Sequence, residues 1–137
     1  LFKGIPDTVT ALARDAVLYV ITSNLGEIVS RVLQNGGVTG IKEIWGAEKE
    51  TSKVRKIHRL RERHPECPPF YIGDTSGDIR EARKAGVGAL AVTWGWHDRE
   101  RLLRAGPDAL FNSPAELAAF FTQPGDVHDT KTERNAC

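Results

Sequence analysis

The stretch YIGDTSGD, residues 71–78, decides how the chain folds and where its chemistry lies. Its apolar start continues from Phe70 and predicts a buried strand, and its polar end predicts the start of a helix. Gly73 lets the backbone turn sharply, so Asp74 is expected to project from the edge of a sheet. Asp78 follows at the start of the helix, and two converging carboxylates suit Mg²⁺. In the structural alternative, Asp78 is only a helix N-cap and Asp74 an ordinary turn residue.

Strands and helices alternate along the rest of the chain. Short apolar runs predict strands at 17–21, 41–45, 70–72, 89–93 and 109–111, and helical patterns lie between and around them. This alternation predicts an α/β fold, a three-layer Rossmann-like parallel sheet with helices on both faces. We expect 1–121 to form this core and the polar, non-periodic stretch 122–137 to be a disordered tail.

Polar side chains follow a second predicted strand. Thr22, Ser23 and Asn24 come directly after the apolar run 17–21. A hydroxyl and backbone amides at such a strand end form a natural phosphate cradle, although the same residues also suit a simple N-cap cluster. Ligands of parallel sheets bind at the carboxyl ends of the strands, so we expect this cluster to face the same crevice as Asp74.

Lys53 is the third candidate. It stands at a predicted helix start, where the helix dipole disfavours a cation, so pairing with carboxylates and a phosphoryl group would explain its position. A solvated surface lysine is the alternative. The neighbouring Arg55 and Lys56 show no comparable reason for a role in the site.

Composition limits the classes of partner. The formal charge of +1 gives no bulk attraction for nucleic acid, and no apolar run is long enough to span a bilayer. The chain opens without a secretory leader, so a cytoplasmic protein acting on a small molecule is expected.

Taken in order, these motifs resemble those of the haloacid dehalogenase superfamily. The resemblance implies that Thr22, Ser23 and Asn24 bind phosphate, that Lys53 steadies the phosphoryl charge, and that Asp74 and Asp78 hold Mg²⁺. It implies a phosphatase acting on a small phosphorylated metabolite. The downstream pattern is typical of the phosphoglycolate-phosphatase-like branch, and it includes Ala85-Gly86-Val87, Val92-Thr93-Trp94-Gly95, Gly106-Pro107-Asp108 and Ser113-Pro114.

One family motif is missing from these 137 residues. Family members carry Asp-x-Asp after their first strand, where the first Asp attacks phosphorus and the second acts as acid and base. No Asp-x-Asp occurs here, so we expect the chain alone to be inactive and the first strand and cap to lie upstream of Leu1. A truncated, non-catalytic binding or assembly module is the alternative. A flavodoxin-like or receiver domain is a third interpretation. A receiver needs an acidic pair near its beginning, and the early chain offers only Asp7 and Asp15, around a helix.

The missing strand has a structural consequence. In the family it lies between the strands that correspond to 17–21 and 70–72, so its absence leaves two apolar edges open. Open edges invite association with other chains. We therefore expect a homodimer or an upstream segment to fill this place, rather than direct pairing of the two strands.

Overall fold

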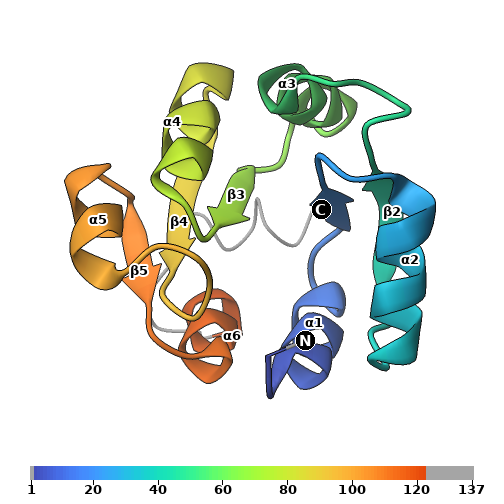
Figure 1. Cartoon of the computed structure of the whole chain (residues 1–137), viewed down its shortest axis with the longest axis horizontal. Helices are drawn as coiled ribbons and strands as arrows, with labels where there is room; N and C mark the ends of the chain where they lie inside the picture. Colours follow the sequence, from blue (N-terminus) through green and yellow to red (C-terminus); the bar gives the residue numbers. More distant parts are fainter. Residues whose placement is uncertain (1, 123–137) are drawn as a thin grey trace.

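The structure, a computed structural model, describes residues 2–122. Helices and strands alternate throughout, as the sequence predicts (Figure 1). The helices are α1 (Ile5–Ala13), α2 (Gly26–Asn35), α3 (Lys53–Arg63), α4 (Ser76–Ala85), α5 (Arg99–Arg104) and α6 (Pro114–Thr122). The strands are β1 (Leu18–Ile21), β2 (Ile41–Trp45), β3 (Phe70–Gly73), β4 (Gly88–Val92) and β5 (Ala109–Phe111).

The strands form two separate parallel sheets. β1 pairs with β2, and β3, β4 and β5 pair in that order. β1 and β3 face each other across the middle of the molecule (Figure 1), and no pairing joins them among the described residues. The α/β class and parallel pairing are therefore confirmed, and the two strands do not close directly on each other.

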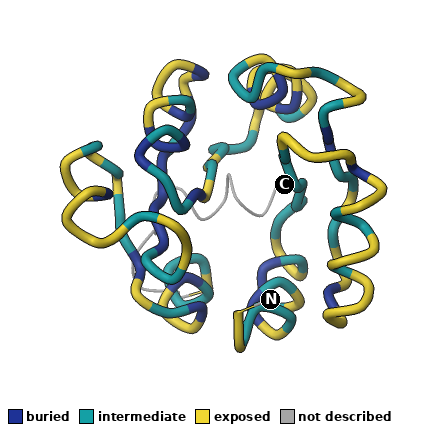
Figure 2. The backbone as a smooth tube through the Cα atoms, in the orientation of Figure 1, coloured by how far each residue is buried: buried dark blue, intermediate teal, exposed yellow. Residues whose placement is uncertain are grey.

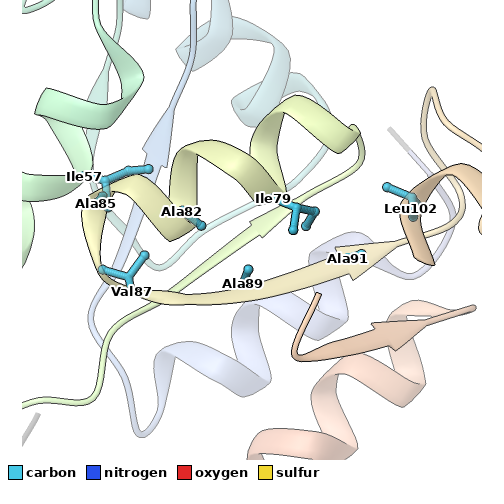
Figure 3. Packing of buried hydrophobic residues seen from close by; sticks show 8 residues of the cluster. All are labelled: Ile57, Ile79, Ala82, Ala85, Val87, Ala89, Ala91 and Leu102. Carbon is cyan, nitrogen blue, oxygen red and sulfur yellow. The ribbon is translucent and has the colours of Figure 1, made fainter. Parts of the chain in front are cut away.

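Helices cover both faces of the larger sheet. On β4, Ala89 and Ala91 point to one face and pack with Ile79 of α4 and Leu102 of α5 (Figure 3). Alternate residues of the same strand point to the other face, where Leu90 and Val92 pack with Phe111 and Leu117. Because successive side chains of a strand point to opposite faces, β4 connects both halves of the core.

Local signals set the helix boundaries near the site. The Ser52 hydroxyl caps α3 by accepting a hydrogen bond from the Arg55 amide. Thr75 and Asp78 form a reciprocal capping box at the start of α4. Gly86 ends α4 with a φ of 76°, a left-handed conformation that favours glycine.

Helix α2 carries an exposed apolar face. Leu25, Ile28 and Val32 are each about half exposed, because no described element covers them. Much of α2 is coloured as exposed in Figure 2. Of the expected tail 122–137, Thr122 closes α6, and the remainder lies outside the described residues. Nowhere from 2 to 122 does a helix have the length and apolarity needed to cross a membrane.

Adjacent leucines on α5 provide a test of this core. Leu102 is fully buried, whereas Leu103 is 49% exposed. We expect Leu102→Ala to lower the free energy of unfolding by about 2–5 kcal/mol, because it leaves a cavity beneath α5. Leu103→Ala should change it by less than about 1 kcal/mol. Urea unfolding of both variants measures the difference, and equal losses would show that α5 is not packed as described.

Candidate active site

Asp74 and Asp78 meet at the carboxyl end of β3. Gly73, the last residue of the strand, lies so close to Asp78 that a Cβ on Gly73 would be 2.3 Å from the Asp78 Cβ. The φ angle of Gly73 is not positive. The glycine is therefore needed for close approach, rather than for the sharp turn that the sequence suggested.

The Asp78 carboxylate is almost fully engaged. Its Oδ2 accepts hydrogen bonds from the backbone amides of Asp74 and Thr75, each at 3.1 Å. Its Oδ1 accepts from the Nζ of Lys53 at 3.1 Å, and the Asp78 side chain is only 6% exposed. Asp78 thus fixes the backbone of Asp74 and anchors the lysine in one contact network.

Electrostatics favour the ionised form of Asp78. Burial alone would raise the pKa of this carboxyl group. The charge of Lys53 and the hydrogen bonds from Lys53 and Thr75 outweigh burial and lower the pKa below its ordinary value of 3.8. At neutral pH the site therefore contains a carboxylate paired with a lysine ammonium.

A loop after β4 closes over Asp74. The Trp96 amide donates to Asp74 Oδ2 at 2.9 Å, and the His97 amide donates to the Asp74 carbonyl at 3.1 Å. His97 Nδ1 in turn accepts from the Ser76 amide. A Cβ on Gly95 would be 2.1 Å from Asp74 Oδ2, so glycine is required there as well. The sequence marks this loop only through Trp94 and Gly95 of the downstream pattern, and its contacts with the acidic motif were not predicted.

The predicted phosphate cradle follows β1. The Thr22 amide donates to the Trp45 carbonyl, which continues the pairing with β2. The Asn24 amide donates to Thr22 Oγ1 at 3.0 Å. Within the described part of the chain, no acceptor binds the Ser23 amide, so that N–H and the Thr22 hydroxyl hydrogen are available donors.

Helix α3 connects the two groups of candidate residues. Lys53 pairs with Asp78 beyond β3, whereas Lys56, one turn later, donates to the Thr22 carbonyl at 2.7 Å. Lys56, for which the sequence shows no reason for a role in the site, is completely buried. Its signal was spacing, because Lys56 lies four residues before the buried Leu60 and next to the buried Ile57.

A magnesium ion fits this donor set in part. Among residues 2–122, no three His, Cys, Asp or Glu side chains gather as a metal site. Asp74 Oδ2 is engaged by Trp96, and no described group donates to Oδ1, which leaves one carboxylate oxygen free. Mg²⁺ commonly binds through one or two carboxylates together with waters and substrate phosphate. Asp74 can therefore supply one ligand, but the described residues do not form a complete cage.

A cavity lies between β1 and β3, the facing strands of the two sheets. Its volume is about 390 Å³, and both β1 and β3 line it. The Thr22 amide bonds to β2, so by alternation the backbone groups of Tyr19 and Ile21 point away from β2, toward the cavity. The Pro69 carbonyl bonds to β4, so those of Phe70 and Ile72 also point toward the cavity. Backbone groups of β1 and β3 that have no strand partner among the described residues therefore face this cavity from both sides.

Comparison with known proteins identifies the fold. No protein-family model matches the chain. The phosphoglycolate phosphatase of Synechococcus elongatus is 34% identical over 127 residues, a match that covers 90% of this chain and 60% of the relative. That of Vibrio vulnificus strain YJ016 is 26% identical over 125 residues, covering 85% of the chain and 54% of the relative. The chain therefore spans little more than half the length of these relatives.

Solved structures of similar proteins match the chain over about the same share of its length as the curated relatives do. A haloacid dehalogenase-like hydrolase from Streptococcus pneumoniae superposes with a TM-score of 0.78 at 30% identity, covering 88% of this chain and 60% of that one. A predicted phosphatase from Clostridium acetobutylicum, at 24% identity, shares the fold with a TM-score of 0.77, over 89% of this chain and 60% of that one. These likenesses exclude the flavodoxin-like and receiver readings. The chain belongs to the haloacid dehalogenase superfamily, in its phosphoglycolate-phosphatase-like branch.

Proposed function

We propose that this chain forms most of the catalytic core of a Mg²⁺-dependent phosphatase that acts on a small phosphorylated metabolite. The observation that carries the proposal is the linked arrangement of Asp74, Asp78 and Lys53 at one strand end, with Thr22 tethered through the same helix. The similarity to phosphoglycolate phosphatases supports a small phosphomonoester as the substrate class.

Each residue receives a role that matches its contacts. Asp74, with one free carboxylate oxygen, is the proposed direct ligand of Mg²⁺, which would neutralise charge on the phosphate. Asp78 supports the metal site by holding the Asp74 amide. The Thr22 hydroxyl and the exposed Ser23 amide donate to the phosphate oxygens, and Asn24 completes the turn.

Lys53 is proposed to stabilise charge on the transferring phosphoryl group. Its Nζ is held by Asp78 Oδ1, and its side chain remains 24% exposed. An ammonium group carries three donors, so two remain for a phosphate or an attacking carboxylate. Holding the cation in place before the substrate arrives avoids reorganisation during the reaction.

The nucleophile is proposed to arrive on an extended apolar segment between β1 and β3. The cavity there is lined mainly by apolar side chains of both strands, and backbone groups of four residues point into it. A parallel strand in this place would end between Thr22 and Asp74. An Asp-x-Asp following such a strand would therefore face the phosphate, the lysine and the metal together.

The first prediction concerns turnover. The chain alone should not hydrolyse p-nitrophenyl phosphate above background, because residues 1–137 contain no Asp-x-Asp. A fusion with a family segment that supplies the first strand, the Asp-x-Asp motif and the cap should hydrolyse it when Mg²⁺ is present. In that fusion, Asp74→Asn should lower kcat/KM by at least about 100-fold, whereas the exposed Asp15→Asn should not.

Two outcomes would contradict this account. Turnover by the unfused chain, abolished by Asp74→Asn, would place the nucleophile within these 137 residues. A fusion that folds and binds phosphate but does not turn over would favour the non-catalytic binding or assembly module.

The second prediction uses the pH dependence of stability. The pKa of Asp78 is lowered in the folded state, so its stabilising effect is present above the unfolded pKa of about 3.9 and is lost as pH falls through the folded value. Asp78→Asn should lower the free energy of unfolding by roughly 1–3 kcal/mol near neutral pH, because Lys53 loses its partner. The deficit relative to the unmodified chain should shrink on acidification.

Urea unfolding at a series of pH values measures this deficit. Asp15→Asn is the matched control, because Asp15 is exposed and its side chain makes no hydrogen bond or ion pair in the described part of the chain. A deficit for Asp78→Asn that stays constant into strong acid would show that the carboxylate charge does not stabilise the site.

A further inference from the structure

Lys56 is a buried cation that the proposed chemistry does not use. Its relative exposure is 0%, and its Nζ donates to the carbonyls of Thr22 at 2.7 Å and Gly46 at 3.4 Å. No carboxylate lies within ion-pair distance of it among residues 2–122. Burying an ammonium without a carboxylate partner costs several kcal/mol, and an apolar residue of similar size would often be more stable. A core position therefore carries a charge that packing alone does not require.

The two acceptors show where this charge acts. Thr22 directly follows β1 and Gly46 directly follows β2, so the two hydrogen bonds of Lys56 join the ends of these strands. The same region is joined by hydrogen bonds from the Ala47 amide to the Asn24 carbonyl and from the Asn24 amide to Thr22 Oγ1. Each bond restrains the turn that holds the candidate phosphate donors.

The charges around Lys56 also favour an anion at the neighbouring turn of residues 22–24. Burial lowers the pKa of the Lys56 ammonium, and the charge of Lys53 lowers it further. Glu48, Glu50 and Glu81 oppose this change but do not cancel it. A phosphate dianion at the adjacent turn would be attracted to both lysines and would compensate part of the cost of burial.

We propose that Lys56 is a positioning residue for phosphate binding. Its hydrogen bond holds the Thr22 carbonyl, so that the Thr22 hydroxyl and the Ser23 amide face a bound phosphate. Its positive charge also attracts that phosphate. This inference rests on the proposed function, which makes residues 22–24 the phosphate cradle. Lys53 acts from the acidic side of the site and Lys56 from the cradle side.

Binding of inorganic phosphate to the full chain tests the proposal. Lys56→Met keeps the length of the side chain and removes the ammonium, and Lys84→Met removes an equal charge from an exposed position of α4. By calorimetry or ³¹P NMR, Lys56→Met should weaken phosphate binding at least about tenfold. Lys84→Met should bind as the unmodified chain does. Unchanged affinity in Lys56→Met would overturn the proposal.

Amide hydrogen exchange separates this inference from the proposed function. Exchange at Asn24 and Ala47 should accelerate in Lys56→Met and not in Lys84→Met, whether or not phosphate binds. If the unmodified chain binds no phosphate, the proposed cradle fails, and unchanged exchange at these amides would additionally overturn the positioning role.

A second measurement uses the unmodified chain and does not depend on the variant folding. The ¹⁵Nζ resonance of Lys56 should shift during a phosphate titration, while that of Lys84 stays in place. An unshifted Lys56 resonance at saturating phosphate would overturn the role of its charge.

Discussion

Two lysines one turn apart on α3 connect the two sheets of this molecule. Lys53 reaches Asp78 beyond β3, and Lys56 reaches the Thr22 carbonyl at the end of β1. β1 and β3 share no hydrogen bonds among the described residues, so α3 links their strand ends at the site, while α1 packs on α6 elsewhere between the two halves. The candidate active site is therefore built on a helix that spans a gap, rather than on one continuous sheet.

The acidic half of the site is rigid for a separate reason. Glycine at positions 73 and 95 lets backbone approach the Asp78 and Asp74 side chains at distances that any Cβ would prevent. Hydrogen bonds from the backbone then orient both carboxylates, and Asp78 is almost fully buried. Such preorganisation keeps one oxygen of Asp74 free while its neighbours are fixed, which is what a partly hydrated Mg²⁺ site needs.

Sequence reasoning recovered the fold class and the positions of the strands because apolar runs are local signals. The ordered motifs were enough to identify the superfamily, which the comparisons confirm. The roles of Thr22, Lys53, Asp74 and Asp78 remain predictions, although the structure places Lys53 beside Asp78. The burial of Lys56 was not predicted, because its spacing from Leu60 marks the helix face but does not reveal the tertiary packing that buries a lysine there. The contacts of the loop at Gly95 were missed for the same reason.

The central claim is that a parallel strand belongs between β1 and β3. Amide hydrogen exchange on the unfused chain tests it most directly, because alternate residues of each strand face opposite sides. The account predicts fast exchange at Tyr19, Ile21 and Ile72, whose amides point toward the cavity, and slow exchange at Val20 and Tyr71, whose amides point toward β2 and β4. In the fusion that supplies the strand, the first three amides should become protected. Equal protection of both sets in the unfused chain would contradict the claim and show that the gap is already closed.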